Sequence, residues 1–247
     1  MRGKGQVITF DGHILNDLFY TGEVEVGLPS FQPDVVQRVG AHGSIMRSTR
    51  MEGPSIVVPL VVKPRRGHEP REAISALLSW LDVDGPKALT LSDDDGLVRM
   101  VVPDGTPDVG DHRFGDRLTI EFTQLDPWLY GESKSATVPS GGSVAISVGG
   151  DFATPPTVSA SAAIRNSSSL LWGVRLDNAD YLRVKLPTSS ATAVSMNCGA
   201  RTCTVGGDHV APTLQSDWLS LSPGQHVIRN DVGSGAATVA WVERWHR

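Results

Sequence analysis

The stretch most informative about the fold reads LTIEFTQLDPWLYG and spans residues 118–131. In its first half, the apolar residues Leu118, Ile120 and Phe122 alternate with polar ones. This period of two predicts a β-strand that buries one face. The second half ends in Asp126-Pro127-Trp128-Leu129-Tyr130-Gly131, and the composition of the chain changes directly after it. The stretch therefore indicates a β-rich fold and marks a candidate domain boundary.

Composition differs between the two sides of this boundary. Residues 1–132 contain 13 Lys and Arg against 20 Asp and Glu, a net charge of −7, whereas residues 133–247 contain 9 against 7, a net charge of +2. Ser and Thr number 14 in the first part and 26 in the second. We therefore expect two domains, residues 1–131 and 132–247. The Ser/Thr-rich segment 134–143 is either a linker or the first edge strand.

One helix stands out in the first part, within Glu69–Val83. Four apolar residues in this segment recur at i, i+3, i+4 and i+7, which predicts one buried stripe. These residues are Ile74, Leu77, Leu78 and Leu81. A proline in the first turn and a Gly-Pro pair after the last turn fit the two ends of a helix. A single helix packed on a sheet is an α+β arrangement, so we expect a mainly β chain with one helix.

The other strand predictions come from short runs between turn residues. Ile56–Val62 is apolar throughout, and because Pro59 lacks an N–H group, we expect this strand to lie at an edge or to carry a bulge. The second part shows only strand signals at spacings of about 8–12 residues, which favours a β-sandwich. Its candidate strands are Val144–Val148, Thr157–Ala163, Leu170–Leu176, Tyr181–Leu186, Ala193–Cys198, Cys203–Val205, Trp218–Leu221, Gln225–Asn230 and Ala237–Arg244.

Charge and hydropathy argue against several classes of protein. The 247 residues carry a formal charge of −5, which disfavours a nucleic-acid binder because such proteins cluster cations against phosphates. The longest apolar run, Ile56–Val62, is too short to cross a bilayer as a helix, which needs about 20 residues. The N-terminus shows no apolar signal-peptide core, so we expect the chain to fold in a cytoplasm.

The sequence contains none of the common motifs for catalysis or cofactor binding, such as G-x-S-x-G, a P-loop, H-E-x-x-H or G-x-G-x-x-G. We therefore expect no enzyme activity, no catalytic residues, no metal and no cofactor. Asp93-Asp94-Asp95-Gly96 is interpreted as a turn, because it lacks the spaced ligands of a calcium loop. Cys198 and Cys203 are interpreted as two thiols that face each other in a hairpin, either reduced or bridged.

Several stretches, taken in order, resemble the distal tail protein family of long-tailed, non-contractile bacteriophages over about 230 of the 247 residues. They are Ile8–His13 with Leu15–Asp17, Val39–Gly43, Leu91–Asp94, Leu118–Phe122 with Asp126–Gly131, Asn197-Cys198 with Arg201-Thr202, and Ser216–Gly224. The chain departs from the family pattern in three places. His42 replaces an acidic or polar residue, Asn197 replaces the commoner Asp, and Gln225-His226 stands where Asn is frequent.

The resemblance singles out two groups of residues. The domain-junction motif consists of Asp126, Pro127, Trp128, Tyr130 and Gly131. The C-terminal motifs consist of Cys198, Cys203, Asp217, Trp218, Pro223 and Gly224. Neither group points to a ligand-binding residue.

The resemblance also implies a fold and an assembly. It implies an N-terminal ring-forming domain, a β-sandwich with one helix and a projecting hairpin, followed by a C-terminal galectin-like β-sandwich. Six copies are expected to form a ring at the tail tip of the virion, assembled in the host cytoplasm. The implied partners are further copies of the chain, the tail tube protein, the tail-tip hub protein and receptor-binding proteins. DNA is expected to pass through the lumen without specific binding, and no membrane insertion is expected.

Physical arguments add two hypotheses. The acidic balance of residues 1–132 suits a lumen through which DNA passes, because like charges prevent sticking. The second part is either a docking platform for receptor-binding proteins, which we favour, or a binder of host-wall sugars through exposed Trp residues. A carbohydrate-binding module with an accessory domain is the alternative to a ring component. The oligomeric state separates these two interpretations.

Overall fold

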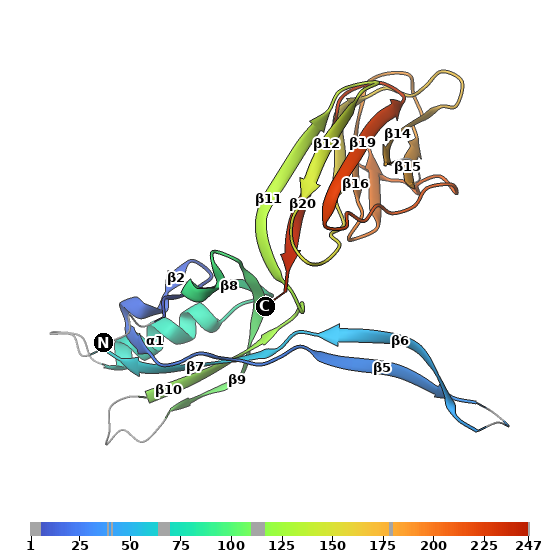
Figure 1. Cartoon of the computed structure of the whole chain (residues 1–247). Helices are drawn as coiled ribbons and strands as arrows, with labels where there is room; N and C mark the ends of the chain where they lie inside the picture. The colour runs from blue at the N-terminus through green and yellow to red at the C-terminus, as the bar shows by residue number, and fades with distance from the viewer. Residues whose placement is uncertain are drawn as a thin grey trace. The chain divides into compact units, whose positions relative to one another are not determined.

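The computed structural model describes residues 6–38, 40, 42–63, 70–109, 117–177 and 180–246, without the side chains of residues 106–109. The chain divides into two compact units, one that ends at Leu129 and one that runs from Tyr130 to His246 (Figure 1). Each unit has a hydrophobic core of its own. No helix in the described ranges is long and apolar enough to cross a membrane.

The first unit is built on an eight-stranded antiparallel sheet in the order β2-β1-β8-β9-β10-β7-β3, with β4 also paired to β7. Its strands are β1 (Ile8–Phe10), β2 (His13–Ile14), β3 (Phe19–Thr21), β4 (Glu25–Val26), β7 (Ser55–Val62), β8 (Lys87–Leu91), β9 (Arg99–Val109) and β10 (Arg117–Gln124). Two short 3-10 helices, Leu15–Asp17 and Ser92–Asp94, connect some of them.

The alternation predicted for residues 118–123 is confirmed in β10. Leu118, Ile120 and Phe122 are buried, whereas the residues between them are exposed or half-buried. The ring of Phe122 packs against that of Phe10 with a centroid distance of 5.1 Å. Because β10 pairs with β7 on one side and β9 on the other, its buried residues lie at the centre of the hydrophobic core of the first unit.

The helix α1 (Pro70–Leu81) packs on this sheet and lies within the predicted segment. Only Leu77 of the predicted stripe is fully buried, while Ile74 and Leu81 are half-buried against the core. Leu78 was expected on the buried stripe, but 50% of its surface is exposed. The reason is that the buried face is centred on Leu77 with Ala73 and Trp80 beside it, which turns Leu78 to its margin.

Of the two alternatives expected for Pro59, an edge position or a bulge, the edge position is wrong. β7 lies inside the sheet, between β10 and the pair β3 and β4. The Pro59 carbonyl accepts the N–H of Gly22 at 2.8 Å, so the proline nitrogen faces the same side. Residue 22 lies in the gap between the end of β3 at Thr21 and the start of β4 at Glu25, so no strand hydrogen bond requires the missing N–H.

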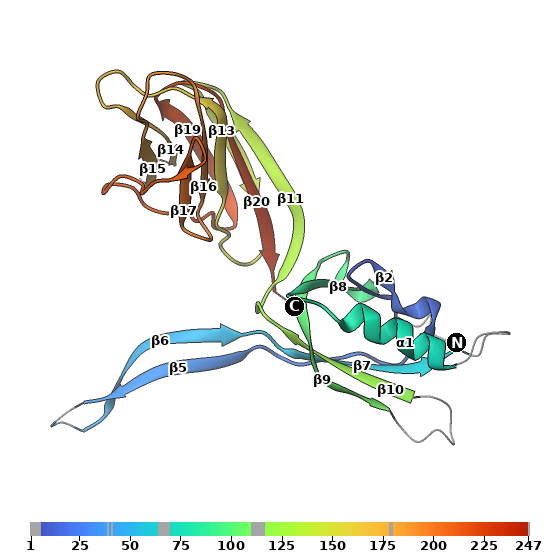
Figure 2. The ribbon, with the colours of Figure 1, turned by 180° about the vertical axis from the view of Figure 1, so that it is seen from behind.

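A long hairpin leaves this sheet. Its strands β5 (Ser30–Gln37) and β6 (Ser44–Glu52) pair only with each other and form a separate two-stranded sheet. Both views show it extending away from α1 and from the rest of the first unit (Figures 1 and 2). The register shifts between Asp34 and Val35, which leaves Arg47 as the extra residue of β6.

The second unit is a sandwich of two antiparallel sheets. The six-stranded sheet contains, in order, β11 (Leu129–Val138), β20 (Ala237–Trp245), β13 (Thr157–Ala163), β16 (Thr192–Asn197), β17 (Thr202–Val205) and β18 (Asp208–His209). The four-stranded sheet contains β12 (Ser143–Val148), β19 (Gly224–Val232), β14 (Leu171–Leu176) and β15 (Asp180–Lys185). Side chains of both sheets share one core, with Trp172 and Met196 fully buried. The predicted mainly β fold with one helix is thus confirmed.

Two local predictions in the second unit are settled by the strand pairing. Of the two alternatives for segment 134–143, the edge strand is correct, because the first half of the segment belongs to β11, the edge strand of the six-stranded sheet. Trp218–Leu221 is not a strand, and only Leu221 makes an isolated bridge, to Thr154. Leu219 and Leu221 of this segment are buried and belong to the hydrophobic core of the second unit.

Candidate assembly surfaces

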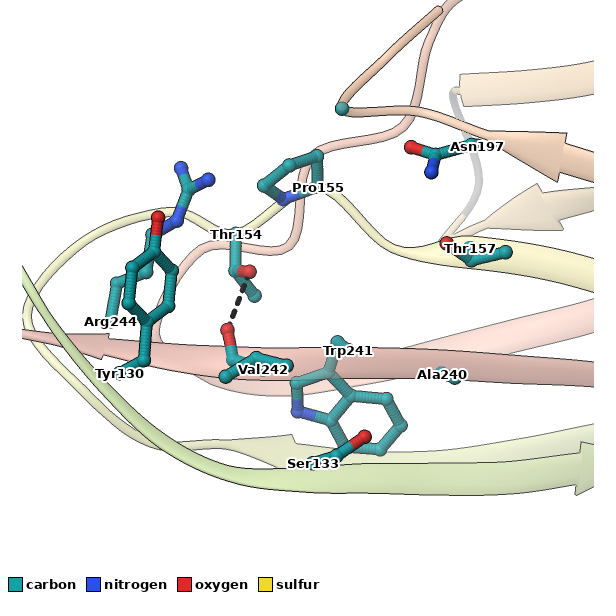
Figure 3. Close-up of a pocket in the computed structure, with 11 residues that line it drawn as sticks. Tyr130, Ser133, Thr154, Pro155, Thr157, Asn197, Ala240, Trp241, Val242 and Arg244 are labelled. Atoms are coloured by element: carbon teal, nitrogen blue, oxygen red, sulfur yellow. Dashed lines mark hydrogen bonds between the residues drawn. The ribbon is translucent and has the colours of Figure 1, made fainter. Parts of the chain in front are cut away.

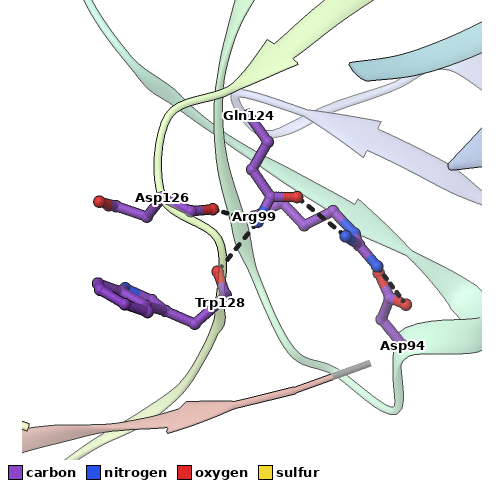
Figure 4. A network of polar contacts seen from close by, with 5 residues as sticks. All are labelled: Asp94, Arg99, Gln124, Asp126 and Trp128. Carbon is purple, nitrogen blue, oxygen red and sulfur yellow. Dashed lines mark hydrogen bonds and ion pairs between the residues drawn. The ribbon is translucent and has the colours of Figure 1, made fainter. Parts of the chain in front are cut away.

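A buried polar network lies beside the turn that ends the first unit (Figure 4). Arg99, which is 1% exposed, donates from Nε to Asp94 Oδ2 at 2.8 Å and from Nη2 to Asp94 Oδ1 at 3.1 Å. Its Nη1 donates to Gln124 Oε1 at 2.9 Å. The Nε2 of Gln124 then donates to the carbonyl oxygens of Asp126 at 2.5 Å and of Trp128 at 3.1 Å.

This network joins two motifs that are far apart in the sequence. Asp94 neutralises the guanidinium of Arg99, which is necessary because an unpaired buried charge is strongly destabilising. Gln124 links this ion pair to the backbone of the turn, because its side-chain amide accepts from Arg99 and donates to two carbonyl oxygens of the turn. Asp126 and Trp128 of the domain-junction motif therefore take part through their main chain, while Pro127 is buried. The sequence patterns did not reveal Arg99 or Gln124.

The other two residues of the domain-junction motif belong to the second unit. The guanidinium of Arg244 lies over the ring of Tyr130, with 5.9 Å between Cζ and the ring centroid. Gly131 is closely packed, because a Cβ at this position would lie 3.1 Å from Nε1 of Trp245. The motif thus divides into a turn held by the first unit and the start of an edge strand of the second.

A pocket of about 290 Å³ lies on the outward face of the six-stranded sheet (Figure 3). Asn197, Thr157 and Ala240 form one row across β16, β13 and β20. The next row along the strands, which includes Val158, is buried in the core, so the first row faces away from it. The small Ala240 side chain contributes to the hollow at the floor of the pocket.

The walls of the pocket combine apolar and polar groups. Tyr130 and Pro155 contribute apolar surface, and Thr157 contributes a hydroxyl group. The Oδ1 atom of Asn197 accepts the N–H of Ala200 at 2.9 Å, which orients the amide so that its nitrogen can donate to a ligand. Arg244 also lines the pocket and adds a positive charge. Such a surface suits a hydroxyl-rich group or a polypeptide.

The structure contradicts the expectation that the two cysteines face each other. The register of β16 and β17 pairs Cys203 with Met196, and Cys198 lies beyond the last pair. Both thiols are free and buried. Burial raises the pKa of Cys198 to about 11, although a hydrogen bond from the Leu219 N–H group lowers it, and burial also raises the pKa of Cys203. Both side chains therefore act as core residues with little thiolate character.

The second C-terminal motif closes an edge of the four-stranded sheet. The N–H of Asp217 donates to the Tyr181 carbonyl at 2.8 Å, which covers part of the edge strand β15. Trp218 is half-buried against the core. Pro223 and Gly224 are exposed where the chain bends into β19, and Gly224 has a φ of +129°. Asp217 and Trp218 thus support the sandwich.

His226, which departs from the family pattern, forms a cluster with Asp177 and Ser222. Its Nδ1 lies 2.9 Å from Asp177 Oδ2, and its Nε2 lies 2.7 Å from the Ser222 carbonyl oxygen. Burial alone would lower the pKa of His226, but the bonds to Asp177 and Ser222 outweigh it and raise the pKa above 6.5. Both ring nitrogens face acceptors, so Nε2 is not a base for the Ser222 hydroxyl at 3.3 Å. The cluster fastens the turn after β14 to the start of β19.

The β5–β6 hairpin has two distinct faces. The cross-strand pairs Phe31–Met51 and Val35–Met46 lie on one face, which we name the apolar face. The pairs Ser30–Glu52, Gln32–Arg50, Asp34–Ser48 and Val36–Ile45 lie on the other face, which carries Arg50 together with two acidic residues. Phe31 is 64% exposed and Met46 is 63% exposed. These are large apolar side chains left in contact with solvent.

Residues that could bind a metal do not gather in the described part of the chain, where no group of three or more His, Cys, Asp and Glu is close enough to hold an ion. Asp93-Asp94-Asp95-Gly96 forms the turn expected from its sequence, with a φ of +51° at Asp95 and +83° at Gly96. Of the family-like turn Val39–Gly43, residues 39 and 41 lie outside the described residues.

Comparison with family models assigns a class to each half of the chain. Residues 13–123 match the phage tail protein RIFT-related domain, and residues 149–245 match the C-terminal domain of siphovirus-type tail components. The two models together span most of the sequence, so the chain belongs to the siphovirus-type phage tail components. The resemblance to the distal tail proteins of these phages is thereby confirmed.

Comparison with the solved structure of a phage protein gives the same fold. The crystal structure of SPP1 Dit matches with a TM-score of 0.72 and 21% identity. The match covers 98% of this chain and 99% of that chain. SPP1 Dit is described as a paradigm of the hub adsorption apparatus in phages that infect Gram-positive bacteria. A chain of the phage P2 baseplate in its activated conformation with Ca matches with a TM-score of 0.46 and 12% identity, over 90% of this chain and 91% of that chain. The sequence matches none of the curated proteins compared with it.

These matches define the general role of the protein. It is a structural component of a phage tail, and its place is in the virion.

Proposed function

We propose that six copies of this chain form a ring at the distal end of the tail. The ring would join the tail tube protein to the tail-tip hub protein and carry receptor-binding proteins. In this proposal residues 1–131 form the ring and residues 132–247 form a galectin-like sandwich that serves as the docking platform. The fold shared with SPP1 Dit and the matches to both tail domains support this assignment.

The observation that carries the proposal is the uncovered apolar face of the hairpin. A two-stranded hairpin is at best marginally stable in water, and Phe31 and Met46 add large exposed apolar groups. A neighbouring copy that covers this face would remove the apolar surface from water. Because the hairpin and the surface that receives it are different parts of the chain, such a contact is heterologous and can close into a ring.

Charge supports a lumen that conducts DNA without binding it. Residues 1–132 have a net charge of −7, and like charge keeps a polyanion from adhering to the wall. The ring would be assembled in the host cytoplasm before it joins the virion. An imaged ring whose lumen is lined by neutral or basic residues would contradict this part of the proposal.

The test is the mass of the purified chain in solution, measured by light scattering over a concentration series and followed by negative-stain imaging. We expect particles of six times 26.4 kDa that appear as rings with a central hole. A chain that remains monomeric at every concentration, also after mixing with its tail tube and hub proteins, would contradict the proposal.

The pocket of the second unit supports a second candidate function, the binding of a host-wall sugar. Tyr130 offers a ring face, while Asn197 and Thr157 offer a donor amide and a hydroxyl group. The test is a glycan array with the wild type and the Ala240→Leu variant, which fills the floor of the pocket. Binding that this substitution removes, and that Ser195→Ala elsewhere on the sheet leaves intact, would favour the sugar over a pure docking platform. An array without any binding would reject the sugar.

A further inference from the structure

Basic side chains gather on the outward face of the four-stranded sheet in the second unit. Val174 and Leu182 of this sheet are buried in the core, so the residues that alternate with them in their strands point away from it. The basic residues on the outward face are Arg175 on β14, Arg183 and Lys185 on β15, and Arg229 on β19. All of them are half-buried or exposed. We name Arg175, Arg183 and Arg229 the arginine cluster.

Strand pairing brings the arginine cluster together around one tyrosine. Arg175 lies directly opposite Arg229 in the pairing of β14 with β19, and directly opposite Tyr181 in the pairing of β14 with β15. The guanidinium of Arg183 stacks on the Tyr181 ring, with 3.6 Å between Cζ and the ring centroid. The guanidinium of Arg175 lies 5.5 Å from the same centroid and donates from Nη1 to Tyr181 Oη at 3.2 Å. Two guanidinium groups thus contact one tyrosine, and the third belongs to a cross-strand neighbour.

Nearby carboxylates do not balance the charge of the arginine cluster. Arg175 forms an ion pair from Nη2 to Asp231 at 2.7 Å, but in the described part of the chain neither Arg183 nor Arg229 forms one. Two further carboxylates lie at the edge strand β15 without an ion pair to a described residue, those of Asp180 and Asp217. Like charges directly opposite each other in a sheet, as in Arg175 and Arg229, are destabilising. An anion from outside the chain would relieve this repulsion.

The three arginine side chains are held against the sheet. The Nε atom of each is buried and has no hydrogen-bond partner among the described residues. Gly173 lies opposite Arg183 and leaves room for its stem, because a Cβ at Gly173 would lie 3.0 Å from Arg183 Cγ. Side chains that are packed in this way lose less conformational entropy when a ligand binds. Their planar guanidinium groups match phosphate and carboxylate groups.

A phosphate group fits this arrangement better than a carboxylate. Its oxygens point to the corners of a tetrahedron, so arginines on different strands can bind it at once, whereas the two oxygens of a carboxylate lie in one plane. Arg175 and Arg229 are on adjacent strands about 5 Å apart, so both can reach one group. Lys185 lies about 7 Å along β15 from Arg183, which suits a ligand that carries repeated phosphates. Exposed Ser143, opposite Arg229 in β12, offers a hydroxyl group to a sugar or polyol.

We propose that the arginine cluster binds the phosphate groups of a polymer on the host surface in which sugar or polyol units are joined through phosphate. A virion meets such a polymer on the cell that it infects. The inference goes beyond the proposed ring, because a single chain carries the whole cluster. It also differs from the pocket described above, which lies on the six-stranded sheet, whereas the cluster lies on the four-stranded sheet. An acidic segment of another protein is the competing occupant.

The experiment is isothermal titration calorimetry of the full chain with poly(glycerol phosphate) at two salt concentrations. We expect binding that weakens with salt, and a loss of about tenfold in affinity for Arg229→Gln, which breaks no ion pair. The matched control is Arg201→Gln, which removes the same charge from the exposed turn between β16 and β17 and should bind like the wild type. Ala240→Leu, which fills the pocket of the other sheet, should also leave this binding intact.

Further probes identify the ligand and exclude a folding defect. Arg229→Gln removes the repulsion with Arg175, so the melting temperature without ligand should be unchanged or raised while binding is weakened. Polyglutamate that binds as tightly as poly(glycerol phosphate) would overturn the phosphate assignment in favour of an acidic polypeptide. Glycerol 3-phosphate that binds as tightly would overturn the polymer. No binding, or equal losses in Arg229→Gln and Arg201→Gln, would overturn the cluster, and the ring would still be tested separately by light scattering.

Discussion

The Nε atom of Arg99 lies 2.8 Å from Oδ2 of Asp94 in the interior of the first unit, where both side chains are almost completely buried. This pair anchors Gln124, and Gln124 holds the turn that leads into the second unit. The path of the chain at the end of the first unit therefore depends on a salt bridge in its core.

Removal of one partner should strongly destabilise the first unit. Asp94→Ala leaves the Arg99 guanidinium buried without its counter-ion, and we expect a loss of about 3–5 kcal/mol in the free energy of unfolding. Urea denaturation followed by circular dichroism measures this loss. The control is Lys87→Ala, which breaks the exposed pair with Asp11 at 3.0 Å and should cost at most about 1 kcal/mol. Equal effects of the two substitutions would contradict the assigned role.

The same turn leaves no room for a side chain at Gly53. A Cβ at this position would lie 2.1 Å from the carbonyl oxygen of Gln124, which is backbone and not free to move away. We expect Gly53→Ala to cost about 1–3 kcal/mol, the range for overpacking. Gly85→Ala is the matched control, because a Cβ there meets no atom within 4 Å. A melting temperature that falls equally in both variants would show that the turn can adjust.

Stability of the second unit should depend on pH through His226 and Asp177. The hydrogen bond to His226 is the largest cause that lowers the pKa of Asp177, and the pKa of His226 is raised above 6.5. The stabilisation by His226 is thus fully present below pH 6.5 and is lost as pH rises through the raised pKa of His226. The stabilisation by Asp177 is fully present above pH 3.8 and is lost as pH falls through the lowered pKa of Asp177.

The variant His226→Gln tests this dependence. Its melting temperature should fall below that of the wild type at pH 6, by the equivalent of up to about 1 kcal/mol, and the gap should narrow at pH 9. Asp177→Asn should show the same narrowing, because it removes the other partner. A gap that stays constant between pH 6 and pH 9 would mean that the charge of His226 does not contribute.

The two cysteines should be unreactive in the folded chain. With a pKa of about 11, Cys198 is ionised in roughly one molecule in a thousand at pH 8, and the thiolate is the reactive form. We expect a colorimetric disulfide reagent to label neither Cys198 nor Cys203 at pH 8 within minutes, and to label both in denaturant. Fast labelling of a chain that keeps its native circular dichroism would contradict the buried placement.

Local patterns in the sequence predicted most of the elements. The alternation at Leu118–Phe122 and the period of α1 depend on side-chain directions that repeat along one segment, so they can be read without knowledge of the partner segment. The same holds for Thr157–Ala163, whose predicted bounds are those of β13. The candidate sites were less predictable. The domain-junction motif was identified, but Arg99 and Gln124, which hold it, were not.

Several predictions that depend on neighbouring segments failed. Pro59 does not mark an edge, because its nitrogen faces the gap between β3 and β4, where no strand hydrogen bond is needed. Cys203 lies opposite Met196 because the register of the hairpin is set by the buried faces of both strands. Asp177 and His226 are 49 positions apart and meet through the pairing of β14 with β19.

The order of residues thus determines where the strands and the helix form and where acidic composition gives way to Ser and Thr. It also places Glu121 on a strand. Tertiary structure decides that Glu121 lies opposite Asp104, and that Phe31 and Met46 of the β5–β6 hairpin stay exposed. The physical reason is that strand periodicity is a property of one segment, whereas register and burial arise when distant segments pack against each other.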